Sequence, residues 1–212
     1  MKMKENIHVL LLKGGFGPER EVSLESAKAC SKAIKENGFK VTEVDYATMN
    51  INKLIDVKPD VCFNALHGDS GENGSIQGLL NILKIPYTHS GVTASAIAMN
   101  KLHFKRLVIN ATEGSDDPIN FPKTLETLPG SNNDFTSHKG VYVIKPLNGG
   151  SSVDVEIIRE GSQVQAINKT NHNNLIAEEY VGSKELTVTV LREEPLCVTE
   201  IIAGQNKAFY NY

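Results

Sequence analysis

Apolar runs of strand length alternate with amphipathic stretches over the first hundred residues. Residues 7–12 form a continuous apolar run, which is typical of a strand covered on both faces. Runs at 40–46 and 61–66 predict two more strands, and the amphipathic stretches predict helices over 23–37 and 75–83. Because strands and helices alternate with short connections, we expect a parallel sheet with helices on its faces.

The pattern changes after the first hundred residues. Residues 93–109 predict a longer helix that leaves the first domain, and residues 110–140 are rich in Ser, Asp, Asn, Pro and Gly, with weak structure near 121–128. A helix is expected over 163–169. Short β-rich runs with turn signals between them lie at 141–145, 153–158, 175–180, 185–191 and 197–202. We therefore expect a β-rich second domain beginning near residue 100, with the last strands opening a third unit.

Composition narrows the class of protein. The 212 residues are 40% hydrophobic and 22% charged with a net charge of −3, so nothing predicts a nucleic-acid footprint or a membrane-surface patch. No apolar run reaches the roughly 18–20 residues of a membrane span. Cys30, Cys62 and Cys197 are far apart, without CxxC spacing, which favours buried thiols over a disulfide or zinc site. We expect a soluble cytoplasmic protein.

The first candidate site is the glycine-rich turn KGGFGPEREVSL at residues 13–24. Glycines directly after a first strand let the chain turn tightly and bring backbone N–H groups to a ligand at the following helix. The turn is not GxGxxG, and Asp45 is the nearest acid after the second predicted strand. On its own, such a turn is more often plain topology than a binding site.

The second candidate, HGDSGENGSIQG at residues 67–78, directly follows the third predicted strand. Open α/β sheets bind ligands at the carboxyl ends of their strands, which is where this glycine-dense segment falls. His67 is suited to donating a hydrogen bond to a substrate or stabilising developing charge. The alternative is that His67 caps the strand end and the glycines only turn the chain.

Two further candidates lie in the β-rich half. In VIKPLNGGSSV, residues 143–153, Lys145 at a strand end precedes a flexible loop with Ser151 and Ser152, which is suited to cradling a polyphosphate. The lysine precedes the glycines, so this is not a P-loop, and a plain hairpin loop remains an alternative. In LIAEEYVGSKELTV, residues 175–188, an apolar strand with acids suits a purine and its ribose, although paired acids are usually a solvated face.

These four elements in this order resemble the D-alanine–D-alanine ligase family of the ATP-grasp superfamily. The most specific match is HGDSGENGSIQG followed by IPYTHSGVTASAIAMNK. The resemblance implies a substrate-binding α/β domain over 1–96 and a central ATP-grasp nucleotide-binding subdomain over 97–184. It also implies the start of a C-terminal ATP-grasp subdomain over 185–212.

For the amino-acid site, the resemblance implies that ATP phosphorylates the carboxylate of one D-alanine and that the amine of a second attacks the acyl phosphate, giving a dipeptide for peptidoglycan. Glu19 matches the acid that holds the ammonium group of the first D-alanine. His67 matches the histidine near its carboxylate and the developing acyl phosphate. Ser151 matches the serine that helps to order this site through a network with Glu19.

For the nucleotide, Lys101 and Lys145 match lysines that contact the α- and β-phosphates of ATP, and Ser151 and Ser152 lie in the loop that closes over them. Glu178 matches the acceptor for the adenine amino group and Glu185 the acid that binds the ribose. Glu179 and Val181 are expected to flank the adenine through their backbone groups. The family is usually a homodimer, and we expect the same here.

Several positions depart from the family pattern. Gly17 stands where a serine is usual, Asn100 replaces an aspartate, and Asp154 replaces a glycine, adding a negative charge beside the phosphate loop. Residues 110–121 lack the usual Gly-Ile-Pro connection. After residue 212 the family continues to the acids that bind two Mg²⁺ (or Mn²⁺) ions. We therefore expect no metal ligands in this segment and no catalysis by it alone.

Three functions are compatible with these residues. The first is ATP-dependent ligation of two D-alanines. The second is a related ligase that takes D-lactate or D-serine as its second substrate, a choice set largely beyond residue 212. The third is a non-catalytic nucleotide- or amino-acid-binding remnant, if the natural chain ends at Tyr212.

Overall fold

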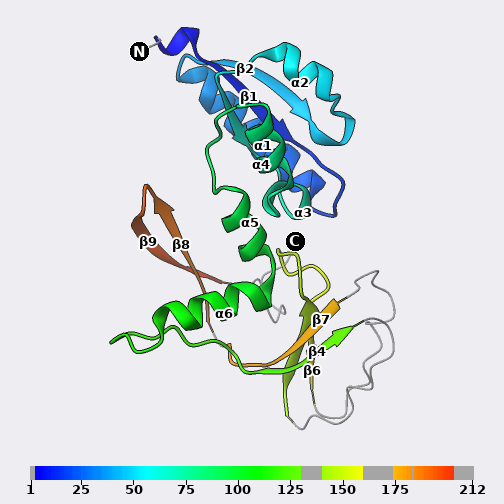
Figure 1. Ribbon diagram of the computed structural model, residues 1–212, viewed down its shortest axis with the longest axis vertical. Coiled ribbons are helices and arrows are strands. Elements are labelled where there is room, and N and C mark those ends of the chain that lie inside the picture. The colour runs from blue at the N-terminus through cyan, green and yellow to red at the C-terminus, as the bar shows by residue number, and fades with distance from the viewer. Residues whose placement is uncertain (1–2, 130–139, 160–173, 183, 203–212) are drawn as a thin grey trace. The chain divides into compact units, whose positions relative to one another are not determined.

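The computed structural model describes residues 3–129, 140–159, 174–182 and 184–202. The chain forms two compact units (Figure 1). The first unit comprises residues 1–111 with 148–150, and the second comprises 112–147 with 151–212. The helix expected over 163–169 lies outside the described residues, and the domain limits expected from the family resemblance stay predictions. None of the helices in the described ranges has the length and apolar character needed to cross a bilayer.

The first unit is built on a parallel sheet with the strand order β2-β1-β3, which confirms the architecture expected from the sequence. In the paired register, Leu10 lies beside Thr42 on one side and Cys62 on the other. The elements up to residue 112 are η1 (Lys4–Asn6), β1 (His8–Lys13), α1 (Arg20–Glu36), β2 (Lys40–Asp45), η2 (Tyr46–Thr48), α2 (Ile51–Val57), β3 (Val61–Asn64), α3 (Asp69–Glu72), α4 (Ser75–Ile82), α5 (Val92–Met99) and α6 (Lys101–Thr112).

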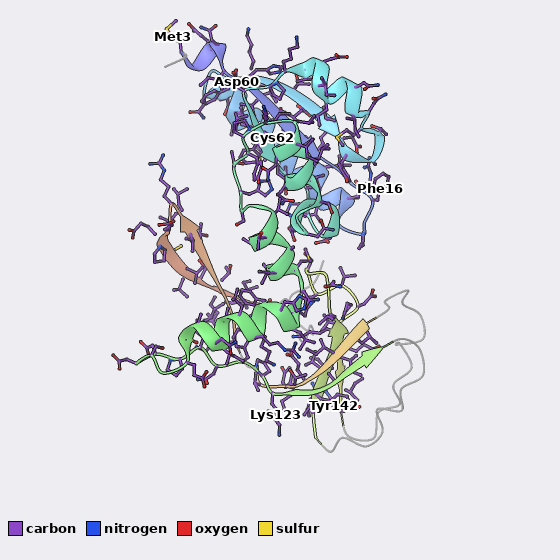
Figure 2. All side chains as sticks on the ribbon, viewed as in Figure 1. Met3, Phe16, Asp60, Cys62, Lys123 and Tyr142 are labelled. Atoms are coloured by element: carbon purple, nitrogen blue, oxygen red, sulfur yellow. The ribbon has the colours of Figure 1, made fainter. Side chains whose placement is uncertain are left out.

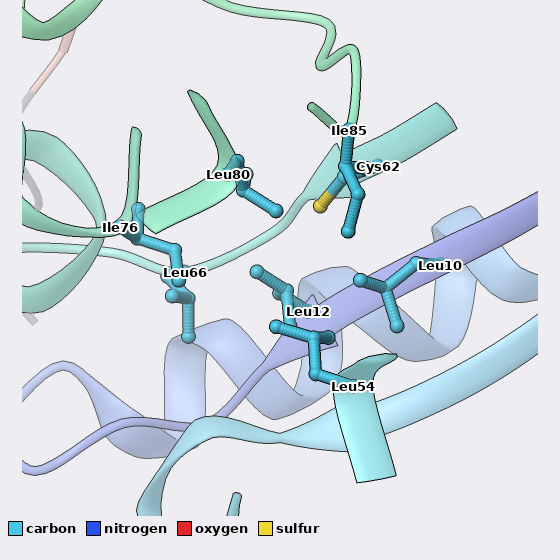
Figure 3. Packing of buried hydrophobic residues seen from close by; sticks show 8 residues of the cluster. All are labelled: Leu10, Leu12, Leu54, Cys62, Leu66, Ile76, Leu80 and Ile85. Carbon is cyan, nitrogen blue, oxygen red and sulfur yellow. The ribbon is translucent and has the colours of Figure 1, made fainter. Parts of the chain in front are cut away.

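Strand β1 is covered on both faces, as its continuous apolar run predicts. Leu11 packs with Ala27 of α1 on one face. On the other face, Leu10 and Leu12 belong to the larger core cluster shown in Figure 3, which also contains Leu54, Cys62, Leu66, Ile76, Leu80 and Ile85. Burial raises the pKa of the Cys62 thiol to about 12, so this cysteine is an inert core residue at neutral pH.

Two helix predictions need correction. Helix α1 begins at Arg20, three residues before the predicted start. The single helix expected over 93–109 is wrong: the chain has two helices, because Asn100 is extended (φ −95°, ψ 108°). The Asn100 side-chain oxygen accepts a hydrogen bond from His103 N at 3.0 Å and so caps the start of α6. A polar side chain able to cap a helix interrupts an apolar pattern that reads as continuous.

Helices α2 and α3 were not predicted. Helix α2 is short and begins after Asn50, whose side chain accepts a hydrogen bond from Asn52 N. It ends at Lys58 in the left-handed conformation (φ 44°). Leu54 is fully buried in the main core cluster, and Val57 packs against that cluster. A helix of seven residues leaves too little periodicity to recognise in a sequence.

The second unit contains an antiparallel sheet with the order β4-β7-β5-β6 and a separate β8–β9 hairpin. Tyr142, Ile144, Ile158, Leu175 and Ala177 form the core of the four-stranded sheet. Figure 2 labels Tyr142 in this core and Cys62 in the core of the first unit. The strand bounds are β4 (Thr124–Pro129), β5 (Tyr142–Pro146), β6 (Glu156–Ile158), β7 (Asn174–Glu179), β8 (Glu185–Leu191) and β9 (Glu194–Ile201).

A charged cluster on the first unit makes a pH-dependent contribution to stability. Glu43 of β2 accepts hydrogen bonds from Lys13 at 2.6 Å, Ser31 at 2.6 Å and Lys35 at 3.2 Å. The hydrogen bond from Lys13, followed by that from Ser31, lowers the pKa of the Glu43 carboxyl from 4.5 to about 2. Because the folded state prefers the ionised carboxylate, the stabilisation is present above pH 4.5 and is lost as the pH falls towards 2.

Glu43→Gln is expected to lower the thermal midpoint at neutral pH and to flatten its fall between pH 4.5 and 2. Thermal unfolding followed by circular dichroism across this range measures both effects. Glu36→Gln is the matched control, because Glu36 is 3.8 Å from Lys32 in a pair whose side chains are mostly exposed. Equal pH profiles for the two variants would contradict the prediction.

Candidate functional site

The glycine-rich turn after β1 is held by an arginine. Arg20 donates to the two carboxylate oxygens of Asp45, at 2.9 and 2.5 Å, and to the Gly15 carbonyl at 3.1 Å. Hydrogen bonding to Arg20 is the main cause that lowers the pKa of the Asp45 carboxyl. Gly14 has φ +78°, and a Cβ there would lie 2.4 Å from Asp45 Oδ1. Asp45 therefore fixes the turn. This structural role explains why an acid follows the second strand, and no bound dinucleotide is needed to explain it.

This turn places Glu19 at the start of α1, where it is only 6% exposed. Its carboxylate lies directly against Gly68: a Cβ at Gly68, which has φ +73°, would be 1.8 Å from Glu19 Oε2. The carboxylate of Glu72 is near enough to be influenced by the charge of Glu19. Desolvation is the main cause that raises the pKa of the Glu72 carboxyl, with a further contribution from the charge of Glu19. Two residues from separate motifs, Glu19 and Gly68, are thus brought into contact.

His67, which was also predicted for substrate chemistry, directly precedes Gly68. Its Nε2 is 3.1 Å from Ser26 Oγ on α1. One turn earlier on α1, Ser23 Oγ accepts from Gly14 N at 2.8 Å and donates to the Ala65 carbonyl at 2.6 Å. The serine-bearing face of α1 therefore ties the loops after β1 and β3 to one another. Neither serine was predicted, although Ser23 belongs to the first motif.

The sequence also did not identify the contact among Asn64, Gln77 and His89, whose side chains meet beside Gly71. The available signal was Gln77, which lies between Ile76 and Leu80 on the apolar face of α4 and is completely buried. A buried glutamine requires hydrogen-bond partners. The need to pair Gln77 predicts a polar network, but it does not predict which residues are the hydrogen-bond partners.

The junction between α5 and α6 holds the start of the predicted phosphate loop. Lys101 Nζ donates to the Gly149 carbonyl at 2.8 Å, and Asn100 Nδ2 donates to Asn148 Oδ1 at 2.9 Å. Asn100 thus acts as both helix cap and amide donor. The Lys101 side chain is therefore long enough to contact the loop that was predicted to bind phosphate.

The following residues adopt unusual backbone conformations. Ser151, Ser152 and Asp154 have φ values of 54°, 58° and 55°, in the left-handed region. Such positions are costly for residues other than glycine, and aspartate tolerates them better than most. Asp154, where the family resemblance implies a glycine, is exposed and has one of these conformations. The conformation explains why glycine suits the site.

In the second unit, Lys145 and Glu178 form an ion pair, with Nζ 2.5 Å from Oε2. Their side chains share a face of the sheet because Val143 pairs with Glu178 and Lys145 with Ile176 on adjacent antiparallel strands. Glu178 is only 4% exposed. The apolar core lies on the opposite face of the sheet, so the ion pair is not part of that core.

The remaining predicted nucleotide residues lie in exposed positions. Glu179 ends β7, with its backbone N–H donating to the Lys123 carbonyl at 3.0 Å. Val181 follows it, and Glu185 begins the exposed hairpin strand β8. The structure therefore brings together Glu19 with the His67 loop in the first unit, and Lys145 with Glu178 in the second. The predicted relation between Glu19 and Ser151 stays a prediction, since these residues belong to different units.

Comparisons with known proteins identify relatives of this chain. A family profile described as "D-ala D-ala ligase N-terminus" matches residues 49–90. The chain is 42% identical to a D-alanine–D-alanine ligase of Parvibaculum lavamentivorans over 99% of its length and 67% of that protein. It spans about two thirds of the length of the curated relatives that it matches.

Solved structures show the same fold. The D-alanine–D-alanine ligase of Bacillus anthracis superposes with a TM-score of 0.74 and 25% identity, covering 92% of this chain and 64% of that one. A structure of the Bacillus anthracis ligase in complex with ATP superposes with a TM-score of 0.75 and 23% identity, covering 94% and 67%.

Proposed function

This chain belongs to the D-alanine–D-alanine ligase family, and on that premise we propose that it supplies the first-substrate and nucleotide-binding parts of an enzyme that joins two D-alanines using ATP. The observation that carries this proposal is the buried Glu19 carboxylate lying against Gly68, in the loop that begins at His67. An amino-acid substrate needs an anion for its ammonium group beside donors for its carboxylate. Glu19 supplies the anion, and the proposal assigns the donor role to His67.

In the proposed reaction, the carboxylate of the first D-alanine is phosphorylated by ATP, and the amine of the second then displaces phosphate. Glu19 binds the ammonium group of the first D-alanine, and His67 stabilises the charge that develops near its carboxylate. Much of the rate enhancement in such a reaction comes from positioning and charge neutralisation. The contacts among α1, Gly68 and the His67 loop support this role, because they hold both residues on rigid elements.

For the nucleotide, Lys101 and Lys145 neutralise phosphate charge, and Ser151 and Ser152 donate hydrogen bonds from the loop. Glu178 accepts from the adenine amino group, with Glu179 and Val181 beside the base and Glu185 at the ribose. The pairing of Lys145 with Glu178 supports this part of the proposal. Without ligand, each charge neutralises the other on one face of the sheet.

The described residues offer no cluster of three His, Cys, Asp or Glu side chains able to hold a metal ion. We place the metal ligands in the third of the family's length that this chain does not span. We also propose that the complete enzyme is a cytoplasmic homodimer and that it acts in peptidoglycan synthesis.

The test is a turnover assay on the protein expressed from its complete reading frame. With ATP, Mg²⁺ and D-alanine, we expect release of one phosphate for each D-alanyl-D-alanine formed. L-alanine is the control substrate and should release none. Phosphate release that does not increase when D-alanine is added would refute the proposed function.

A further inference from the structure

Three polar side chains form a partly buried network beside Gly71. The network comes from three elements: Asn64 ends β3, Gln77 lies in α4, and His89 follows a strand-like segment. That segment runs parallel to β3, with Cys62 paired with Tyr87. This register places Asn64 beside His89, two residues further along each segment. The Nε2 atom of His89 is 3.0 Å from Asn64 Nδ2 and 2.8 Å from Gln77 Nε2.

Both amides converge on one backbone carbonyl. Asn64 Nδ2 donates to the Gly71 carbonyl at 2.9 Å, and Gln77 Nε2 donates to the same oxygen at 2.8 Å. Asn64 also accepts from Leu66 N at 3.1 Å, so its side chain joins the two ends of segment 66–71. Gly71 packs so closely that a Cβ there would lie 2.4 Å from Leu66 Cβ. The loop is closed on itself.

The geometry determines the state of His89. Because the Gly71 carbonyl can only accept, the NH₂ groups of Asn64 and Gln77 must face it, and each has a second hydrogen available to His89 Nε2, whose single lone pair the two groups share. Nε2 is therefore an acceptor, and the proton of the neutral imidazole is on Nδ1. Burial lowers the pKa of His89, which is consistent with a neutral ring. The ring of Tyr87, 5.0 Å away between centroids, packs beside it.

This polar network stabilises the fold less than apolar side chains would. Within the described residues, the buried atoms Gln77 Oε1 and His89 Nδ1 have no hydrogen-bond partner in the protein. An unsatisfied buried polar group costs about 1–3 kcal/mol, so apolar side chains would stabilise the same space at lower cost. What the polar side chains add is a defined position for the Gly71 carbonyl.

The position of Gly71 is transmitted to the candidate site. The backbone N–H groups of Gly71 and Glu72 both donate to the Gly68 carbonyl, at 3.1 and 3.0 Å. Gly68 in turn lies against the Glu19 carboxylate. A shift of Gly71 therefore moves Gly68 and Glu72 relative to Glu19.

We propose that His89 is a positioning residue, which orients the Asn64 and Gln77 amides and thereby holds the Gly68–Glu72 turn in the shape that receives the first D-alanine. The assignment rests on the proposed function for the identity of this substrate. The orienting contact is an acceptor at the imidazole Nε2. A replacement that keeps an acceptor there should keep the turn in place.

The test compares His89→Leu with His89→Gln in the full-length protein. Leucine has no acceptor, whereas Gln Oε1 is separated from Cβ by the same number of bonds as the imidazole Nε2. We expect His89→Leu to raise the KM for D-alanine at least about tenfold while the KM for ATP changes less than about twofold. His89→Gln should restore most of the loss. His8→Leu is the control, because His8 is a half-buried histidine bonded to Thr42 at the opposite end of β1.

Hydrogen exchange of the Gly71 and Glu72 amides provides a readout that does not depend on turnover. It should be faster in His89→Leu than in the wild type and near the wild-type rate in His89→Gln. Equal exchange rates and an unchanged KM for D-alanine in His89→Leu would overturn the proposal, as would a parallel rise in both KM values. If the wild type fails to use D-alanine, the proposed function fails, and exchange alone decides whether His89 positions the turn.

Discussion

Gly68→Ala is expected to cause a large loss of function. The new Cβ would lie 1.8 Å from Glu19 Oε2, and alanine would have to adopt φ +73°. The left-handed backbone costs alanine about 1 kcal/mol, and the overlap must displace the Glu19 carboxylate or the turn. We expect kcat/KM for D-alanine to fall by about a hundredfold and the free energy of unfolding to fall by about 2–4 kcal/mol.

Two glycines in the same unit separate these effects. Gly38 has φ +87° with nothing within 4 Å of its Cβ position, so Gly38→Ala measures the cost of the backbone conformation alone. Gly78 lies in α4 with equally open space and no left-handed φ, so Gly78→Ala should be neutral or stabilise by up to about 1 kcal/mol. Denaturant unfolding and D-alanine kinetics of all three variants are the measurements. If Gly68→Ala and Gly38→Ala have the same unfolding free energy and the same D-alanine kinetics, the contact between Gly68 and Glu19 is not important for function.

The second large effect is expected at the ion pair of the second unit. Lys145→Met removes the cation 2.5 Å from Glu178 and leaves a carboxylate in a position that is only 4% exposed. Breaking a buried pair on one side is more damaging than removing both charges. Because Lys145 itself is 25% exposed, we expect a loss of about 2 kcal/mol, less than for a fully enclosed pair. Nucleotide affinity should fall at least about tenfold, because a phosphate-neutralising charge is lost.

The double variant Lys145→Met/Glu178→Gln separates stability from binding. Neutralising Glu178 removes the uncompensated charge, so the free energy of unfolding should recover while nucleotide affinity stays low. Denaturant unfolding and calorimetric titration with a non-hydrolysable ATP analogue measure the two quantities. Lys32→Met is the matched control, since its partner Glu36 is 3.8 Å away in an exposed pair, and it should change neither. A single variant as stable as the wild type would show that the pair does not stabilise the sheet.

Much of the first unit could be predicted because its signals are local. The run ending in Leu12 identified a doubly covered strand, and the turn and loop motifs placed Glu19 and His67 at the carboxyl ends of parallel strands. The same reasoning failed at Asn100, where apolar residues on both sides suggested one helix. Helix capping by a single side chain has no periodic signature, so it does not appear in a hydrophobic pattern.

The amino-acid sequence by itself indicated the order of the strands, the alternation that predicts a parallel sheet in the first unit, and the motifs that identify the family. Only the tertiary structure decided which residues of those motifs meet. Gly68 is required because Glu19 approaches it from another loop, and Lys145 faces Glu178 because of the antiparallel register. His89 joins Asn64 and Gln77 across 25 and 12 positions of the chain. Periodicity and local motifs record the neighbours of a residue along the chain, whereas these contacts depend on how separate strands and helices pack.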